Sequence, residues 1–352
     1  MLTRSAVLAA LAALFAVACS PERPASSDAT APPPDAGVVN VYSARHYDAD
    51  AAVFKAFTAE TGIRVQTIEA QGDQLIERLK AEAEASPADI ILTVDAGNLW
   101  RLKDQGLLKA VASPTLEAAI PANLRDPEGQ WFGFSKRARV IVYAKGRIDP
   151  NTIATYDSLA APALKGKVCM RTSTSVYNLS LMAARIERVG PGAALAWAKG
   201  VVANFARQPQ GNDTDQIKAI AAGQCDVAVV NHYYLIRMAK SVDSTERQAA
   251  ERVGLIFPDQ ASVGAHVNVS GAGLAKHAPN EANAIRLLEF LVSPAAQADF
   301  AKLNEEFPVV ATAAIGPELQ ALGAYRADDT PLAVYGERQA EAQKLYDEAG
   351  WR

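Results

Sequence analysis

The sequence predicts an α/β protein with two lobes, and two observations support this class. The chain has 352 residues, more than a single hydrophobic core usually serves. From Val38 onward, β-rich runs alternate with amphipathic helical segments in two successive regions, which meet near residues 138 and 139. Such alternation is typical of parallel sheets that are covered by helices.

The first region opens with a β-rich run at residues 38–44, followed by a helical pattern at residues 48–62. Asp48 or Asp50 is a suitable N-cap for this helix, and Gly62 ends it. The next elements are expected to be a strand at 63–70, a helix from Asp73 and a strand at 88–95. The last of these runs is almost continuously apolar, as in a strand covered on both faces.

The second region continues the alternation as far as about residue 263. Strands are expected at 139–144, 166–172 and 225–231, and helices at 177–188, 191–206 and 214–223. A strand at 266–278 and a helix at 280–292 then indicate that the first lobe resumes. The last helix, at residues 330–348, could pack on either lobe.

The N-terminus has the pattern of an export signal. Arg4 is followed by an apolar run that ends in small residues before Cys19, and the run is too short for a membrane span. Residues 1–18 are therefore expected to be removed. The segment AVAC resembles a bacterial lipobox with Ala16 where leucine is usual, so we expect a lipid on Cys19, with simple secretion as the alternative. Residues 19–37 are rich in proline, alanine and serine and are expected to form a flexible tether.

The cysteine count is consistent with export. With Cys19 assigned to the lipid, Cys169 and Cys225 remain. Thiols outside the cytoplasm tend to pair, so a disulfide between these two is expected. The alternative, a site for a soft metal, would need more than two cysteines.

Two broad classes of function are disfavoured. The formal net charge of -4 does not suggest nucleic acid or an anionic membrane as a partner, since either normally needs a basic patch. The sequence also lacks the GxxxxGK[ST], GxGxxG, HExxH and GxSxG motifs of common enzyme classes. An enzyme site assembled from distant residues stays possible, but a binding protein is the stronger expectation.

Tyrosines gather where predicted strands give way to helices. His46 and Tyr47 follow the first strand of the first lobe, Tyr177 follows the second strand of the second lobe, and Tyr233 and Tyr234 follow its third strand. Ligands of open parallel sheets bind at this edge. Several phenols with one imidazole therefore suggest one shared ligand.

A hard and highly charged cation suits such a set of donors. Phenols have a pKa of about 10, so the cation must displace their protons. Fe(III) is acidic enough to do so, whereas Ca²⁺ and Mg²⁺ prefer carboxylates. Four phenolates around Fe(III) leave one negative charge, which Arg45, Arg137 or Arg171 could offset. A single tyrosine at a strand end is nevertheless usually a packing residue, and Tyr42 in the first strand is expected in the core.

Six segments together resemble the bacterial periplasmic ferric-iron-binding proteins, the substrate-binding components of iron ABC importers. They are VYSARHY, ADIILTVDAGNLWRLKDQGLL, WFGFSKRARVIVY, MRTSTSVYN, CDVAVVNHYYLIRM and NEEFPVV. The resemblance runs from about Val38 to the C-terminus. It implies a two-lobe periplasmic-binding-protein fold of type II, with transferrin-like lobes and a hinge of crossover strands near residues 138 and 263. The implied lobes are an N-lobe of residues 38–138 and 264–312 and a C-lobe of residues 139–263 and 313–352.

The resemblance also implies the ligands. Tyr177, Tyr233 and Tyr234 would bind iron from the C-lobe, and His46 and Tyr47 match a branch of the family that adds ligands from the N-lobe.

Other positions take supporting roles by the same resemblance. Arg137 matches the arginine that in many members holds a synergistic anion such as carbonate; members with five protein ligands put that role in doubt and leave its charge-balancing role. The Cys169–Cys225 disulfide would brace the lobe that carries the phenols. His232 alternates away from Tyr233 along the chain, so it is expected behind the ligands or at the surface. The resemblance agrees, because the family does not use this position for metal.

The implied function is iron uptake. Fe(III) would bind in the cleft between the lobes, the lobes would close about the crossover strands, and the closed form would dock on an inner-membrane permease. No bond is made or broken, so no enzyme activity is expected. The protein would act in the periplasm as a monomer, held to the membrane only by its lipid. A receptor for a polyamine, thiamine or a phosphonate is the alternative, and an exported enzyme on a similar fold is a third reading.

Overall fold

The computed structural model describes residues 36–45 and 48–352. The expected signal segment, Cys19, most of the tether, and His46 and Tyr47 lie outside these residues. Among the described residues, no helix combines the length and the apolar character needed to cross a bilayer.

The described strands belong to one ten-stranded sheet. They are β1 (Val38–Ser43), β2 (Arg64–Glu69), β3 (Ile90–Val94), β4 (Leu108–Lys109), β5 (Phe132–Ala144), β6 (Val168–Cys169), β7 (Val227–Asn231), β8 (Val253–Ile256), β9 (Val267–Ala275) and β10 (Phe307–Pro308).

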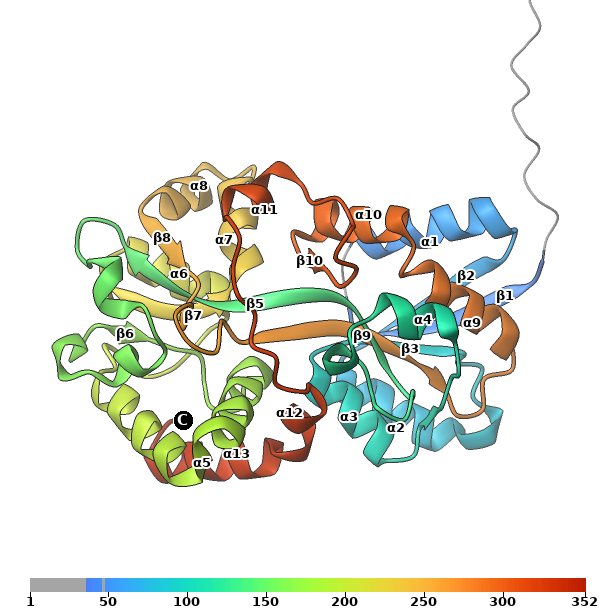
Figure 1. The fold of residues 1–352 in the computed structure, drawn as a ribbon, viewed down its shortest axis with the longest axis horizontal. Helices are drawn as coiled ribbons and strands as arrows, with labels where there is room; N and C mark the ends of the chain where they lie inside the picture. The colour runs from blue at the N-terminus through green and yellow to red at the C-terminus, as the bar shows by residue number, and fades with distance from the viewer. Residues whose placement is uncertain (1–35, 46–47) are drawn as a thin grey trace, which may run out of the picture. The chain divides into compact units, whose positions relative to one another are not determined.

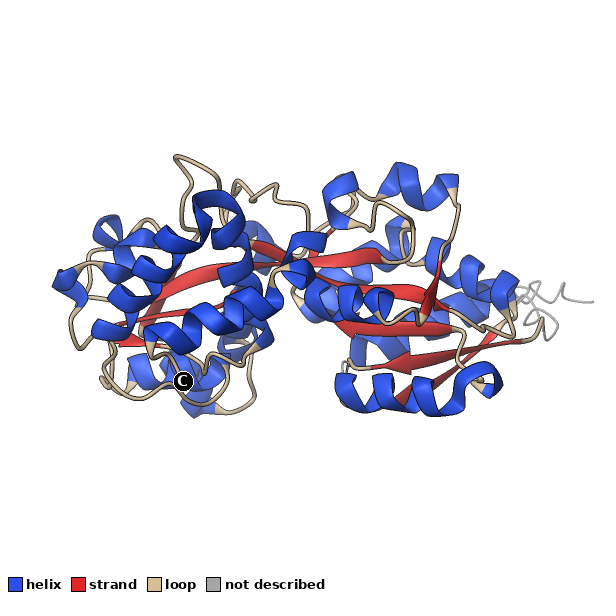
Figure 2. Ribbon diagram, turned by 90° about the horizontal axis from the view of Figure 1, so that it is seen from below, coloured by secondary structure: helices blue, strands red, loops and turns tan. Residues whose placement is uncertain are grey.

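Helices cover the sheet (Figures 1 and 2). They are α1 (Asp48–Thr61), α2 (Gly72–Glu82), α3 (Ala96–Asp104), α4 (Pro114–Ala119), α5 (Val176–Ala203), α6 (Asp213–Ala221), α7 (His232–Ala239), α8 (Ser244–Glu251), α9 (Glu281–Phe290), α10 (Pro294–Asn304), α11 (Pro317–Ala321), α12 (Ala333–Glu337) and α13 (Gln339–Ala349).

The sheet is mixed, whereas the alternation of strands and helices indicated a parallel sheet. The strand order is β2-β1-β3-β9-β5-β7-β6. β1 is parallel to β2 and β3, and β6 is parallel to β7. The long strands β5 and β9 run antiparallel to each other, and each is antiparallel to its other neighbour, β7 or β3. The reason is that these two strands carry the chain between the two groups of βα units (Figure 1).

β5 changes partners in its middle. Residues Phe132 to Ala138 pair with β9, whereas residues from Arg139 onward pair with β7 and β8. The side chain of Tyr156 holds this point: its hydroxyl donates to the Arg139 carbonyl at 2.5 Å and accepts from the His266 N–H at 3.2 Å. One buried phenol therefore ties together the middle of β5 and the start of β9.

The helices predicted at 177–188 and 191–206 are confirmed as two arms of α5. Between them, Gly190 has a φ of 79° and a ψ of 161°, which are not helical values. Only glycine adopts a positive φ without steric cost, and Pro191 cannot continue a helix from before it. The local signal was therefore sufficient to place this break.

The helix predicted at 330–348 is instead two short helices. α12 packs on both α3 and α5, and α13 packs on α5. At Gly336 an added Cβ would lie 2.2 Å from the Cβ of Trp100, so the helix can approach α3 only because this residue is glycine. The last segment of the chain thus contacts elements from both predicted lobes.

Candidate metal centre

Three predicted phenols lie together at the start of two helices. Tyr177 is the second residue of α5, and Tyr233 and Tyr234 are the second and third residues of α7. The ring centroids of Tyr233 and Tyr234 are 4.5 Å apart, and Tyr177 shares a hydrogen bond with Tyr233. Tyr177 and Tyr234 are partly exposed, whereas Tyr233 is buried.

Helix geometry explains how two adjacent tyrosines can meet one ligand. In a strand, neighbouring side chains point to opposite faces. In the first turn of a helix they differ by about 100° around the axis, so both rings can face the same side. β6 and β7 are parallel neighbours, so the segments that follow them, which carry Tyr177 and Tyr233, emerge at the same edge of the sheet. The N-terminal ends of helices also favour negative charge.

Three guanidinium groups surround the ring of Tyr177. Their central carbons lie 5.4 Å from the ring centroid for Arg137, 5.4 Å for Arg139 and 5.1 Å for Arg171. These distances are within the range of cation–π contacts. Arg137 and Arg171 were predicted near the site, but Arg139 was not. The signal for Arg139 was present, because residues two apart on a strand share a face of the sheet.

Arg137 is held within the protein. It donates to the Ser270 hydroxyl and to the Val269 carbonyl, both at 2.9 Å. Burial lowers the pKa of Arg137, but the negative charges available on Tyr177, Tyr233 and Glu306 outweigh burial and raise it above its ordinary value. The guanidinium group is therefore a permanent positive charge beside the phenols.

Tyr177 is protonated at neutral pH. Burial raises the pKa of its hydroxyl group to about 12; a charge on Tyr234 raises it too, whereas Arg137 and the hydrogen bond to Tyr233 lower it. A cation that binds this oxygen must consequently displace a proton. The nearby arginines favour that step, because they stabilise the phenolate.

Asp213, the first residue of α6, organises two of the arginines and was missed by the sequence analysis. Its buried carboxylate accepts from Arg139 at 2.6 Å, from Arg171 at 3.3 Å and from the Asn231 N–H at 2.8 Å. The carboxylate thus fixes both guanidinium groups against Tyr177. Nothing in the sequence around Asp213 distinguishes it from an ordinary acidic residue at a helix start.

Asp213→Asn is expected to lower the free energy of unfolding by about 2 kcal/mol, because Arg139 then lacks its buried countercharge. Urea denaturation measures this change. Asp73→Asn is the matched control, since Asp73 is 78% exposed and its ion pair with Arg101 is expected to contribute less than about 1 kcal/mol. Equal effects of the two substitutions would contradict the role given to Asp213.

Arg45 belongs to a second buried network. It pairs with Asp50 at 2.9 Å and lies 3.7 Å from Glu306. Glu306 is fully buried, accepts from the Ser135 hydroxyl at 2.5 Å and lies 3.8 Å from Arg137. Burial raises the pKa of Glu306, but Arg45 and Arg137 outweigh it and lower the pKa overall. Glu306 therefore links the two arginines, a role that its place in the NEEFPVV segment did not reveal.

His232 is a packing residue. It is fully buried; its Nδ1 accepts from the Ala138 N–H at 3.2 Å, and its Nε2 lies 2.8 Å from the Glu305 carbonyl, to which it donates. Burial lowers the pKa of His232 to about 4, so the ring is neutral. Of the two positions expected for it, the surface is wrong, because both ring nitrogens are used inside the protein.

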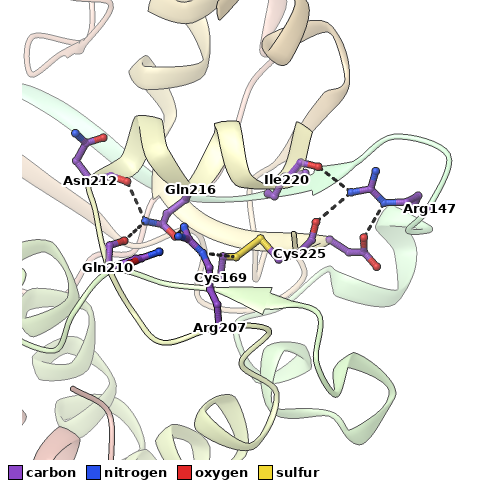
Figure 3. The surroundings of a disulfide bond; sticks show 9 residues. Arg147, Cys169, Arg207, Gln210, Asn212, Gln216, Ile220 and Cys225 are labelled. Atoms are coloured by element: carbon purple, nitrogen blue, oxygen red, sulfur yellow. Dashed lines mark hydrogen bonds and ion pairs between the residues drawn. A yellow bond between two sulfur atoms is a disulfide. The ribbon is translucent and has the colours of Figure 1, made fainter. Parts of the chain in front are cut away.

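A disulfide joins Cys169 and Cys225 (Figure 3). Cys169 ends β6, and Cys225 lies just before β7. Arg207 covers the bond, because its Nε donates to the Cys169 sulfur at 3.3 Å and another of its nitrogens donates to Gln216 at 3.2 Å. The disulfide therefore connects the two strands that precede Tyr177 and Tyr233.

Metal sites in proteins are usually built from carboxylate, imidazole and thiol ligands. No group of three or more His, Cys, Asp or Glu side chains in the part of the chain that the structure describes is placed to hold a metal ion. Tyr42, which was expected in the core, is fully buried, and its hydroxyl lies 2.9 Å and 3.0 Å from the two Glu82 carboxylate oxygens.

Curated relatives cover nearly the same length as this chain. Iron uptake protein A1 of Synechocystis is 47% identical over 314 residues, which are 89% of this chain and 87% of the relative. The major ferric iron-binding protein of Neisseria meningitidis is 26% identical over 97% of this chain and 98% of its own length.

Solved structures are similar over the same span. A Trichodesmium protein, solved in complex with iron and citrate, has a TM-score of 0.88 and 50% identity, covering 90% of this chain and 100% of that one. A ferric binding protein from Campylobacter jejuni has a TM-score of 0.84 and 39% identity, covering 89% and 100%. These likenesses confirm the predicted fold class, the periplasmic-binding-protein fold of type II, and the resemblance read from the sequence.

A family model described as bacterial extracellular solute-binding protein matches residues 52–327. The match agrees with the expectation of a binding protein rather than an enzyme, since the relatives are named for binding and uptake. The chain belongs to the family of bacterial extracellular solute-binding proteins.

Proposed function

We propose that this protein binds Fe(III) between its lobes and delivers it to an ABC-transporter permease for uptake. The observation that carries the proposal is the meeting of Tyr177, Tyr233 and Tyr234 beside three guanidinium groups. Protonated phenols alone bind little, but a trivalent cation converts them to anionic oxygen ligands. The names of the Synechocystis, Neisseria and Campylobacter relatives support the same cargo.

The proposed ligands are the three C-lobe phenols together with His46 and Tyr47, which lie outside the described residues. Arg137, Arg139 and Arg171 would offset the negative charge of the phenolates, and Asp213 would hold two of them in place. Arg45 would add positive charge less directly, because it lies near Glu306, and Glu306 in turn lies near Arg137. Carbonate or another anion would complete the site, and the family resemblance assigns it to Arg137.

Closure of the lobes would complete the site. The proposed N-lobe comprises residues 38–138 and 264–312, and the proposed C-lobe comprises residues 139–263 and 313–352. The change of β5 partners between Ala138 and Arg139 supports the first boundary. A cation with ligands from both lobes binds the closed form better than the open form, so it shifts the population toward closure. The permease would recognise the closed form.

The proposed function also implies a cellular location. The protein would work in the periplasm as a monomer, anchored by a lipid on Cys19 after removal of residues 1–18. The family is extracellular by its description, which supports export.

Loading with Fe(III) tests the proposal. The purified protein is expected to show a broad visible charge-transfer band from phenolate to iron, and a strong chelator is expected to remove the band. Ga(III) is the matched control, because it has a similar charge and preference for oxygen ligands but gives no such band. A protein that stays colourless with Fe(III) while binding another solute would refute the proposal.

A receptor for an organic solute is the second candidate. Three guanidinium groups near the phenols disfavour a polyamine or thiamine, because both are cations. A phosphonate fits the charge, since arginines bind such groups well. Binding of a phosphonate that is indifferent to a chelator would favour this candidate over iron.

A further inference from the structure

A cavity of about 290 Å³ lies beside the junction of β5 and β9, and none of the three phenols lines it. Its walls come from α5, from the segment between β8 and β9, and from the loop at Asp328. Tyr156, which ties β5 to β9, is also part of the lining. The volume is near the lower end of the range for small-molecule sites.

The arginines of this cavity are already neutralised. Arg185 pairs with Asp157, and Arg188 pairs with Asp328 and Asp329. An incoming anion would have to compete with these carboxylates for each guanidinium group. The cavity is therefore a poor site for an anion.

Asp259 is the third carboxylate that lines the cavity, beside Asp157 and Asp328. Among the described residues it forms no ion pair, although the Tyr156 N–H donates to it. Hydrogen bonds at 2.9 Å from the Ser262 and Gly264 N–H groups to the Asp259 carbonyl stabilise its turn, in which φ is 59°. Burial raises the pKa of the carboxyl group to about 6, so it is mostly ionised at neutral pH. The guanidinium group of Arg185 also lowers the pKa of Asp259, but Arg185 already pairs with Asp157. A half-buried carboxylate without an ion pair of its own favours a cation.

His266 offers a second polar contact. The residue is 3% exposed, lines the cavity and packs against Tyr335 with ring centroids 4.8 Å apart. Its Nδ1 has no hydrogen-bond partner within the described part of the chain. Burial lowers the pKa of His266 to about 3, so the ring is neutral and this nitrogen can accept a hydrogen bond. Buried polar atoms of this kind are usually satisfied by water or a ligand.

The remaining wall is apolar. Leu181 and Ala184 are buried on α5, and Val189 on the same helix is a large hydrophobic side chain that is 51% exposed. Val263 faces the same cavity. A short alkyl chain would remove this surface from water.

We propose that this cavity binds a small amino alcohol. Its ammonium group would pair with Asp259, its hydroxyl group would form a hydrogen bond with the imidazole ring of His266, and its alkyl chain would lie along α5. This site is separate from the phenol cluster, so it does not depend on the proposal of iron binding. Natural ligands of the class are short amines that carry a hydroxyl group a few carbons away.

Nuclear magnetic resonance of the purified protein at neutral pH tests the site, with 4-amino-1-butanol as the probe. Saturable shifts of the Gly264 amide and the His266 ring are expected, with a dissociation constant on the order of millimolar for so small a ligand. Asp259→Asn is expected to weaken binding about tenfold or more. Asp104→Asn, a change at an exposed carboxylate that does not line the cavity, should leave binding unchanged.

Related probes test the unmodified protein, so their results do not depend on whether Asp259→Asn folds. On the unmodified protein, 1,4-butanediol should bind more weakly because it lacks the charge, and 4-hydroxybutyrate should not bind. Three results would overturn the proposal: no saturable shift up to about 50 mM probe, unchanged affinity in a folded Asp259→Asn variant, or binding of 4-hydroxybutyrate at least as tight as that of the amine.

Discussion

Tyr233→Phe is expected to weaken Fe(III) binding about a thousandfold. Changes behind metal ligands typically cost about 10- to 100-fold, so the loss of a direct anionic ligand should cost more. The substitution keeps the ring, which packs against His232, Tyr234 and the guanidinium group of Arg237. The substitution therefore measures the contribution of the hydroxyl oxygen alone to iron binding. Competition with a chelator, followed through the visible band, measures the affinity.

Tyr42→Phe is the matched control. Tyr42 is also buried, and its hydroxyl also has a polar partner, the carboxylate of Glu82. Its loss is expected to cost about 1 kcal/mol of stability and to leave iron affinity unchanged. Tyr177→Phe should behave like Tyr233→Phe. Equal iron affinity in the Tyr42 and Tyr233 variants would mean that the proposed ligands are wrong.

Replacement of both Cys169 and Cys225 by alanine is expected to lower the free energy of unfolding by about 4 kcal/mol. The disulfide closes a loop with a sequence separation of 56 residues, and a cross-link of this length removes much of the freedom of the unfolded chain. Both cysteines are buried, so the change also costs some packing. Urea denaturation measures the loss, and the slope with denaturant should rise because the unfolded chain is less compact.

Chemical reduction of the natural protein separates the two contributions. The reduced protein keeps both side chains and loses only the cross-link, so it should show most of the destabilisation without the packing loss. If the reduced and oxidised proteins unfold at the same urea concentration, the disulfide does not stabilise the fold. The iron band of the reduced protein then reports whether the link between β6 and β7 matters for the phenols.

Many elements could be predicted from local sequence. The buried run of β7 and the break at Gly190 depend on apolar patterning and on backbone geometry, which act within a few residues. The direction of β5 could not be predicted in this way. The apolar run at its C-terminal end would suit a parallel strand equally well, and only its partners decide that it is antiparallel to β7 and β9.

Some residues of the candidate site could likewise be predicted from local sequence, and others could not. The placement of Tyr233 and Tyr234 directly after a strand indicated a ligand site, because strand ends of α/β sheets are where ligands bind. Arg139 carried a usable signal in its spacing from Arg137. Asp213 carried none, since it reaches Arg139 from 74 residues away in sequence.

By itself, the sequence determined the order of the elements, the residues that follow each strand and the pair of cysteines available for a disulfide. Only the tertiary structure decided which charges surround the phenols and how they are balanced. The physical reason is that a charge stays ionised in a protein interior only with a partner at short range. Asp213 and Glu306 become such partners for Arg139 and Arg137 through the folding of distant segments onto one sheet.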